Sequence, residues 1–399
     1  MTKTTLSRRQ FLAASVLAAA TSTIVKATSV VGSDANSVLE IGLIGCGGRG
    51  DWITGVFAQN KNYRLVAVAD YFQDRVDAVG SKCNVPADRR YSTLSGYKRL
   101  LDSKLDVAVI ETPPSFHPEQ AAAAVEANKH VFLSKPIAVD VPGSVSVGES
   151  GKKATQKKLA FLVDFQTRAN QYFREAIRRV HAGDMGELIS LYSYYPFGAV
   201  LHNVPLTDAE SYLRNWYQSI ELSGCCIVEQ DIHTLDVATW IAGANPIWAA
   251  GTGGRKIRTH GSINDHYNVT YGFPGNVTLQ FASVKCPGLK DNEIIARAWG
   301  TKGLLDTDYF GDVRISGANP YEGGNCKDNY LAGTVTNVKE FYEAIAGGDF
   351  SNPTVAESVR SNLTCVLGRD AVRHKKLLTW DEMMRTGERL EMKLDGLKS

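Results

Sequence analysis

The first 165 residues contain short apolar runs that alternate with stretches of helical periodicity. Runs this short, rich in β-branched residues and followed by glycine, proline or polar positions, are typical of strands buried on both faces. Alternation of such strands with helices predicts a doubly wound parallel sheet. The expected strands are 38–44, 64–70, 105–111, 130–133 and 159–163, with helices at 51–59 and 119–128.

Beyond residue 165 apolar and polar positions alternate, and many of them are aromatic. Alternation with a period of two predicts half-buried strands. We therefore expect an α/β protein with an N-terminal Rossmann domain, 36–160, and a C-terminal α+β domain, 161–399, built on a largely antiparallel open sheet that binds substrate and forms the oligomer. The expected elements are helices 172–182, 336–346 and 355–373, strands 188–195, 267–273 and 277–281, and turns at Gly198, Gly253-Gly254 and Pro274-Gly275.

The first 35 residues carry an export signature. Arg8 and Arg9 precede an apolar run, 11–20, that is too short to span a bilayer. An arginine pair in this position is an address for the twin-arginine (Tat) export machinery. We assign 1–35 to this signal and expect a periplasmic protein, exported in its folded state with the cofactor already bound.

The composition of the chain limits the classes of partner that we expect. With 44% hydrophobic and 22% charged residues it is typical of a globular protein. A formal net charge of +2 gives no concentrated basic surface, so no nucleic-acid partner is expected. None of the seven cysteines forms a CxxC pair, so no metal site is expected.

A glycine-rich loop follows the first expected strand and fits GxGxxG, which between a strand and a helix predicts dinucleotide binding. Its glycines allow a tight turn, close approach of a pyrophosphate to backbone N–H groups and close helix packing. Asp70 ends the next strand, where a carboxylate accepts ribose hydroxyls and repels a 2′-phosphate, so NAD is expected rather than NADP. The expected cofactor-binding residues of this region are Gly45, Cys46, Gly47, Gly48, Arg49, Gly50 and Asp70.

With these features and several later motifs, the chain resembles the Gfo/Idh/MocA family of oxidoreductases over residues 38–385. The resemblance implies a Rossmann domain, a second α/β domain whose open sheet often forms the oligomer interface, and hydride transfer at a sugar or polyol carbon. A homodimer or homotetramer is therefore expected. The motifs are 45–50, Thr112-Pro113 with His117, Lys135-Pro136, 165–168, 229–236, and 367–371 with 379–382, the last two similar to an exported bacterial branch.

The resemblance gives catalytic roles to Lys135 and His233. The family lysine lies in a Glu-Lys-Pro motif, and in this chain Ser134 stands in place of the glutamate. The family histidine follows an aspartate by four residues on a helix, and here Glu229 takes the place of that aspartate. Substrate placement is therefore expected to differ from that of other sugar dehydrogenases.

These residue types suit the oxidation of an alcohol. Hydride leaves a carbinol carbon only as the hydroxyl proton is removed, which requires a base and a positive group that faces the developing alkoxide. His233, with an ordinary pKa near 6.5, suits the acid/base role. Lys135 suits the alkoxide, and Glu229, on the same helix face as His233, could orient the imidazole or bind a substrate hydroxyl.

Further cofactor contacts are expected at the carboxyl edge of the sheet, where doubly wound folds bind ligands. Thr112 and Pro113 follow a strand there, and the resemblance places Pro113 near the nicotinamide and His117 near its ribose. Gln166 and Arg168 follow the last Rossmann strand and face the same crevice. Arg168 could bind the cofactor or substrate, or could form an interdomain salt bridge.

Substrate contacts are expected from aromatic and polar residues of the second domain. Aromatic faces beside hydrogen-bonding groups suit a sugar ring, although core packing explains Trp216 and Tyr217 as well. The expected substrate-binding residues are Tyr195, Arg214, Trp216, Tyr217, His233 and His266.

The leading hypothesis is a periplasmic NAD-dependent oxidoreductase that acts on a sugar, polyol or glycoside. An exported enzyme meets little free NAD, so the cofactor is expected to be tightly retained. The first alternative is a redox-neutral NAD-dependent glycosidase, which oxidises a sugar carbon, eliminates the aglycone and reverses the redox step. The second alternative is a non-catalytic sugar-binding or dinucleotide-binding protein.

Overall fold

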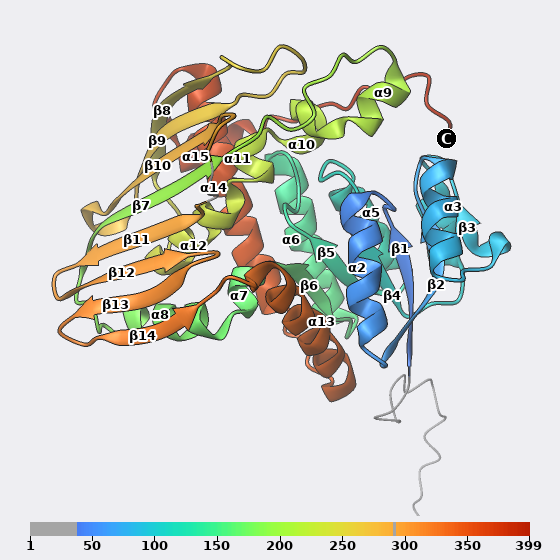
Figure 1. Ribbon diagram of the computed structural model, residues 1–399, viewed down its shortest axis with the longest axis horizontal. Helices are drawn as coiled ribbons and strands as arrows, with labels where there is room; N and C mark the ends of the chain where they lie inside the picture. The colour runs from blue at the N-terminus through green and yellow to red at the C-terminus, as the bar shows by residue number, and fades with distance from the viewer. Residues whose placement is uncertain (1–37, 290–292) are drawn as a thin grey trace, which may run out of the picture. The chain divides into compact units, whose positions relative to one another are not determined.

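The computed structural model describes residues 38–289 and 293–399 (Figure 1). The predicted twin-arginine signal, 1–35, lies outside the described residues. Both predicted sheets, the parallel Rossmann sheet and a largely antiparallel second sheet, are present. Within the described ranges, no helix has the length and hydropathy that a membrane span requires.

The first sheet has six strands, all parallel, in the order β3-β2-β1-β4-β5-β6. Connections from β1 and β4 leave in opposite directions, which opens a crevice at the carboxyl ends of these two strands. The strands are β1 (Leu39–Ile44), β2 (Tyr63–Ala69), β3 (Arg90–Tyr91), β4 (Val107–Ile110), β5 (His130–Ser134) and β6 (Phe161–Asp164). The helices are α2 (Gly48–Gln59), α3 (Gln73–Lys82), α4 (Gly96–Asp102), α5 (His117–Glu126) and α6 (Val141–Gln156), with a 3-10 turn, η1 (Ala87–Arg89).

Two late helices pack back on this sheet. In α13 (Asn329–Gly347), Val338 and Phe341 join the apolar cluster of Phe132 from β5, while α14 (Pro353–His374) packs against α6 and β6. The predicted boundary at residue 160 is therefore misplaced, because β6 begins at Phe161 and is the edge strand of the first sheet. Residues 38–399 cluster as one compact unit.

The second sheet has nine strands in the order β14-β13-β12-β11-β7-β10-β9-β8-β15. Only β10 and β7 pair in parallel among the described strands of this sheet. The predicted turn at Gly253-Gly254 is wrong, since both residues end β8. The strands are β7 (Leu188–Phe197), β8 (Trp248–Gly254), β9 (His266–Gly272), β10 (Thr278–Lys285), β11 (Ile295–Gly300), β12 (Gly303–Asp308), β13 (Asp312–Gly317), β14 (Tyr321–Asn325) and β15 (Leu378–Thr379).

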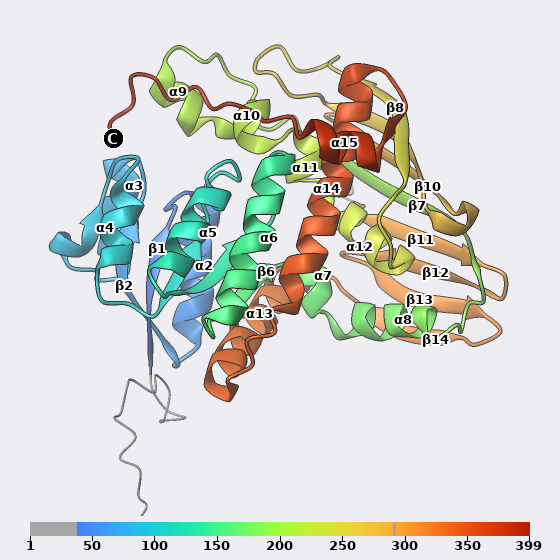
Figure 2. The same cartoon turned by 180° about the vertical axis from the view of Figure 1, so that it is seen from behind.

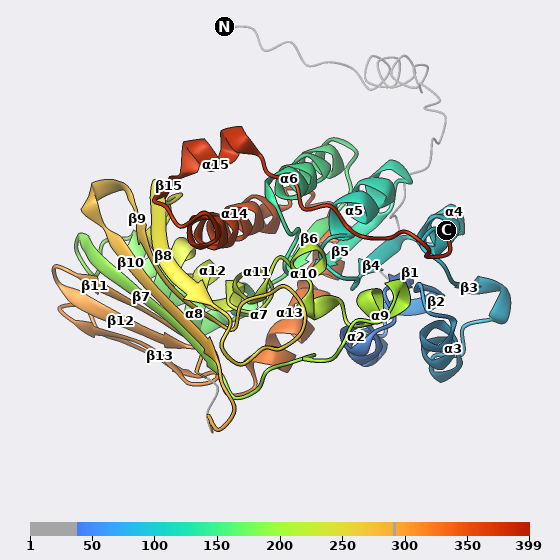
Figure 3. The same ribbon diagram turned by 90° about the horizontal axis from the view of Figure 1, so that it is seen from above.

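Helices cover the face of this second sheet that points toward the first (Figure 3). The strands contact α8 (Gln171–His181), α12 (Ile232–Ala242) and α14. The opposite face carries no helix in the described part of the chain (Figures 1 and 3). The remaining helices are α7 (Gln166–Ala169), α9 (Ala209–Arg214), α10 (Ile220–Ser223), α11 (Cys226–Glu229) and α15 (Trp380–Thr386), with 3-10 turns η2 (Trp216–Gln218) and η3 (Pro274–Asn276).

The last residues, 387–399, form a C-terminal strap. The strap runs past α10 and α9 and ends beside α3 and α4 of the Rossmann part (Figures 1 and 2). Its end is tied down by hydrogen bonds from the Leu94 backbone N–H to the Lys398 carbonyl, 3.0 Å, and from the Lys398 N–H to the Tyr71 hydroxyl, 3.3 Å. Apolar residues of the strap pack on Phe72, Leu213 and Leu222; these residues are Met392 and Leu397.

Candidate active site

The glycine loop after β1 has the conformation that its sequence motif predicts. Gly45 has a φ of +98°, and a Cβ on Gly50 would lie 1.9 Å from the Gly45 carbonyl oxygen. Nothing lies within 4 Å of a Cβ built on Gly48, where α2 begins without a side-chain cap. The first N–H groups of α2 are therefore free to bind an anion.

A first hollow, which we call the outer pocket, opens beside this loop. Asp70 lies at its edge, where its carboxylate accepts the N–H groups of Cys46 at 2.8 Å and Phe72 at 2.9 Å. Burial raises the pKa of Asp70, an effect that these two hydrogen bonds oppose. The pocket has a volume of about 490 Å³ and is lined by Ile44, Ala69, Asp70, Tyr71, Phe72, Arg75, Thr93, Leu94, Tyr97, Thr112, Pro113, Phe116, Gln120 and Leu213.

A second hollow, the inner pocket, contains the three predicted catalytic residues. Lys135 follows β5, Glu229 ends α11, and His233 lies in the first turn of α12. The inner pocket shares Thr112 with the outer pocket, so the two hollows are neighbours. It has a volume of about 670 Å³ and is lined by Arg49, Glu111, Thr112, Pro114, Ser134, Lys135, Pro136, Asp164, Gln166, Trp216, Glu229, His233 and Tyr330.

Lys135 is held in place from both sides of the pocket. Its Nζ donates to the Glu229 backbone carbonyl at 2.6 Å and lies 3.4 Å from Glu229 Oε1. The Lys135–Pro136 peptide is cis, and the Pro136 carbonyl lies 2.8 Å from His117 Nδ1. His117 Nε2 lies 2.7 Å from the Thr112 carbonyl. His117 is therefore fully buried under the loop that carries Lys135. It does not face a cofactor ribose, the position that the resemblance implied for it.

His233 is held as a neutral imidazole. Its Nδ1 is buried and has no hydrogen-bond partner among the described residues. Burial, reinforced by the positive charges of Lys135, Arg49 and Lys285, holds the pKa of His233 well below its ordinary value. The ring meets Tyr309 edge to face, with centroids 5.2 Å apart.

The predicted common helix for Glu229 and His233 is wrong. Gln230 and Asp231 separate α11 from α12, so the two residues lie on different helices. Both nevertheless reach the inner pocket, because it lies where these helices meet. A buried ion pair holds this junction between α11 and α12: Lys285 Nζ lies 2.6 Å from Asp231 Oδ1.

Two buried carboxylates of the inner pocket were not predicted. Glu111 directly follows β4 and Asp164 ends β6, with Arg49 between them. Arg49 Nη2 contacts Asp164, Nε lies 3.6 Å from Glu111 Oε2, and the guanidinium lies over the rings of Trp52 and Tyr330. A sequence signal for both was present, because each carboxylate ends an apolar run at the ligand-binding edge of the sheet.

The other predicted cofactor residues are divided between the two pockets. Pro113 lines the outer pocket, and it is Pro114 that lines the inner one. Gln166 lines the inner pocket and accepts a hydrogen bond from the Tyr309 hydroxyl at 3.0 Å. Cys46 is a buried thiol under the glycine loop, and burial raises its pKa.

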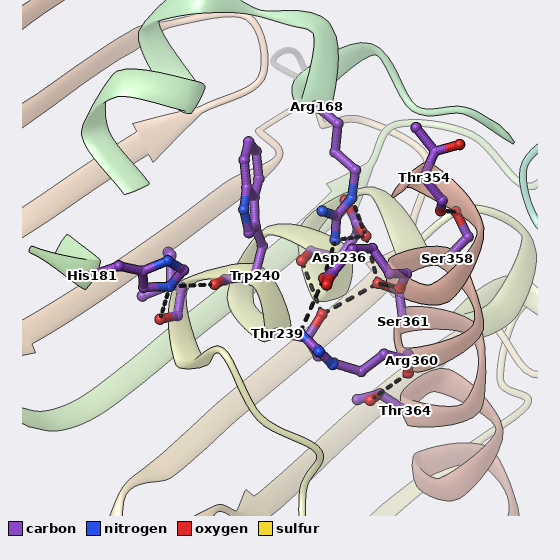
Figure 4. A network of polar contacts seen from close by, with 12 residues as sticks. Arg168, His181, Asp236, Thr239, Trp240, Thr354, Ser358, Arg360, Ser361 and Thr364 are labelled. Carbon is purple, nitrogen blue, oxygen red and sulfur yellow. Dashed lines mark hydrogen bonds and ion pairs between the residues drawn. The ribbon is translucent and has the colours of Figure 1, made fainter. Parts of the chain in front are cut away.

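Arg168 lines neither pocket. Figure 4 shows it beside Asp236 and Trp240. Its guanidinium donates to both carboxylate oxygens of Asp236 at 2.8 to 3.0 Å and lies 4.9 Å from the ring of Trp240. Ser361 of α14 donates to the same carboxylate. Of the roles considered for Arg168, the structure selects the salt bridge, which joins α7, α12 and α14.

The predicted substrate residues are only partly brought together. Trp216 lines the inner pocket, whereas Tyr217 is buried beside it and donates to Gln230. Arg214 pairs with Asp74 at 3.1 Å and lies 3.9 Å from the Phe72 ring, near the outer pocket.

Tyr195 and His266 do not reach the inner pocket. Tyr195 is packed against Ile294 and Tyr309, and Lys285 Nζ lies 4.0 Å from the centre of its ring. His266 begins β9 and pairs with Asp265 at 2.7 Å.

Comparison with family models gives two matches. Residues 39–163 match the model described as the oxidoreductase family with an NAD-binding Rossmann fold, GFO_IDH_MocA. Residues 173–306 match the GFO/IDH/MocA C-terminal domain. Together the two matches include the glycine loop, Asp70, Lys135, Glu229 and His233.

Similar proteins act on sugars and polyols. A scyllo-inositol 2-dehydrogenase (NAD(+)) of Bacillus subtilis is 26% identical over 190 residues, 48% of this chain and 49% of that protein. An α-N-acetylgalactosaminidase of Shewanella oneidensis is 29% identical over 161 residues, 38% of this chain and 34% of that protein. The matched stretches thus span half or less of these two relatives.

Solved structures share the fold. A levoglucosan dehydrogenase in complex with NADH and levoglucosan has a TM-score of 0.71 at 17% identity, covering 86% of this chain and 99% of that one. At this identity the likeness concerns the fold alone.

The residues present fit an NAD cofactor. The uncapped start of α2 and the open space at Gly48 suit the pyrophosphate, and the Asp70 carboxylate suits a ribose diol. The inner pocket continues from the outer one and suits the nicotinamide. Among the described residues no group of three or more metal-ligating side chains is found.

Proposed function

The chain belongs to the Gfo/Idh/MocA family of NAD-binding oxidoreductases, and we propose that it transfers hydride at a carbinol carbon of a sugar or polyol. One observation carries this proposal: Lys135 and His233, from different parts of the chain, line one pocket that adjoins the glycine loop. When bound there, the nicotinamide accepts the hydride.

The surroundings of the two residues suit their roles. The imidazole of His233 is neutral, because its depressed pKa lies below neutrality, and it can accept a hydroxyl proton. The Lys135 ammonium, fixed by the Glu229 carbonyl, supplies positive charge for the developing alkoxide. Glu229 holds Lys135 and offers a carboxylate oxygen to a substrate hydroxyl.

Tight retention of the cofactor is part of the proposal. The C-terminal strap ends on Tyr71 and Leu94, which line the outer pocket, and its apolar residues pack on Phe72 and Leu213, which line it as well. A strap in this place hinders release of the adenosine half of NAD. Retention would let the protein work in the periplasm after Tat export, where free NAD is scarce.

A homo-oligomer formed through the open face of the second sheet completes the proposal. Leu191 and Ser193 of β7 and Ala296 and Ala298 of β11 are buried. The residues that alternate with them on these two paired strands therefore lie on the open face. Trp299, 39% exposed, is one of the residues on the open face. Such an exposed aromatic on an uncovered sheet suits burial against a second copy.

The test begins with the nucleotide that the purified protein carries. We expect acid denaturation to release NAD or NADH, identified by mass, and the loaded protein to change its absorbance at about 340 nm when a sugar or polyol substrate is added. A protein that carries and binds no NAD would refute the cofactor role. A loaded protein that converts glycosides without a net absorbance change would instead identify the glycosidase alternative, which the galactosaminidase relative supports.

A further inference from the structure

Glu111 stands out among the groups that the proposed mechanism leaves unused. Its side chain lines the inner pocket and is fully buried, yet neither carboxylate oxygen has a hydrogen-bond partner among the described residues. The nearby Ser134 hydroxyl donates to the Ile110 carbonyl at 3.1 Å and lies close enough to Glu111 to lower its pKa. A buried carboxylate without hydrogen bonds is costly unless it is neutral or faces a positive charge.

The neighbouring Asp164 shows the contrast. Its two oxygens accept hydrogen bonds from Arg49, from Gln166 at 3.0 Å and from Asn337 at 2.7 Å. Arg49 thus compensates Asp164 and stays 3.6 Å from Glu111. The two carboxylates share one cation but have different environments, the arrangement that divides paired acids into an ionised member and a protonated one.

We propose that Glu111 holds the proton released in the reaction, as a carboxylate opposite NAD⁺ and as a carboxylic acid opposite NADH. The proposal rests on the proposed function, because it assigns the nicotinamide to the inner pocket. It names a residue of this chain for a task that His233 cannot perform.

The atoms and charges balance. The substrate C–H leaves as hydride with two electrons, which reduces the nicotinamide, and the alcohol becomes a carbonyl. The hydroxyl proton is taken up by His233 and ends on the Glu111 carboxylate. The ring loses one positive charge and Glu111 loses one negative charge, so the net charge of this desolvated pocket stays constant. A constant net charge matters because an uncompensated charge in a buried site is strongly unfavourable.

The low proton affinity of His233 supports these separate roles, in which His233 accepts the proton and Glu111 holds it. His233 can accept a proton in passing but cannot keep it, because burial and three nearby cations hold its pKa well below the ordinary value. Burial, reinforced by the charge of Asp164, raises the pKa of Glu111 to about 8, against the opposing effects of Arg49, the Ser134 hydroxyl and Lys135. The charged and titratable groups around Glu111 are Arg49 from α2, Lys135 after β5, Asp164 from β6, Glu229 from α11, His233 from α12 and Tyr330 from α13.

Infrared difference spectroscopy tests the proposal without any substrate. Full-length protein loaded with NAD⁺ and with NADH is compared at about neutral pH for the C=O stretching band of a protonated carboxylic acid. We expect about one such band per protein with NADH and none with NAD⁺. The Glu111→Gln variant should lose the difference, whereas Glu229→Gln, which removes the other glutamate of the pocket, should keep it.

The outcomes are distinct. Identical spectra of the two loaded forms of the unaltered protein would overturn the proposal, as would a band that disappears in Glu229→Gln and persists in Glu111→Gln. Because the two loaded forms of the unaltered protein already give a decisive comparison, the proposal stays testable even if a variant folds poorly. Failure to find a sugar or polyol substrate would count against the proposed function and would leave the infrared result standing.

Discussion

At the scale of single residues, the inner pocket is a set of buried charges with unequal compensation. Lys135 and Asp164 are hydrogen-bonded, whereas Glu111 and Nδ1 of His233 are not. Unsatisfied buried groups are rare in folded proteins, and they concentrate where a ligand completes the hydrogen bonding. Glu111, His233 Nδ1 and Arg49 Nη1 are therefore the groups of this pocket with hydrogen-bonding capacity left for a bound substrate or cofactor.

Removal of the Lys135 charge tests the assigned alkoxide role. In Lys135→Met the methylene stem remains but the ammonium is lost, so kcat should fall about 10²-fold to 10³-fold, as when one oxyanion-stabilising donor is removed. The amount of released NAD should stay stoichiometric. Lys152→Met, a change at an exposed lysine of α6, is the control and should leave kcat unchanged. Equal loss in both variants would argue against the role.

The protonation of His233 gives a pH prediction with a definite sign. A depressed pKa means that the imidazole stays neutral as the pH falls through 6.5 and gains its proton only well below that value. We expect its ring ¹⁵N shifts, assigned by their loss in His233→Asn, to stay constant from about pH 8 to about pH 6. A titration centred near pH 6.5 would show that burial and the surrounding cations have no influence.

At the scale of elements, the loops and helix ends determine the site. The Lys135 loop is braced by His117, the junction of α11 and α12 by the Lys285–Asp231 pair, and the outer pocket by the C-terminal strap. Each brace is made by a segment distant in sequence from the one that it holds.

The strap can be tested by truncation. Removal of residues 391–399 deletes Met392, Leu397 and the Lys398 hydrogen bonds, so NAD should leave about tenfold faster, equivalent to about 1.4 kcal/mol of lost barrier. Dialysis of the loaded protein against buffer, followed by nucleotide analysis, measures the rate. Lys393→Ala, at an exposed position of the strap, is the matched control. An unchanged rate of NAD release after truncation would show that the strap does not retain the cofactor.

At the scale of the whole molecule, late helices join the two sheets. The Arg168–Asp236 pair lies where α7, α12 and α14 meet, and both side chains are nearly or completely buried. A buried pair of this kind need not add stability, but breaking it leaves an uncompensated charge.

Arg168→Ala should therefore lower the free energy of unfolding by about 3 to 5 kcal/mol, because Asp236 stays buried without its cation. Urea unfolding followed by circular dichroism measures the change. Arg178→Ala, which removes an exposed pair with Glu175, should leave the free energy of unfolding almost unchanged. Similar losses for both would mean that water reaches Asp236.

The sequence by itself determined the parallel sheet, the glycine loop with Asp70, and the meeting of Lys135 with His233, because these features follow local periodicity and spacing or a family motif. Only the tertiary structure decided which other polar residues reach the crevice. Glu111 and Asp164 reach it because the parallel strands β4 and β6, on either side of β5, end at the same edge of the sheet. Arg168, Arg214 and His266 are instead held by Asp236, Asp74 and Asp265. A charged side chain goes to the partner that compensates it best, and that partner is distant in sequence for two of these three residues.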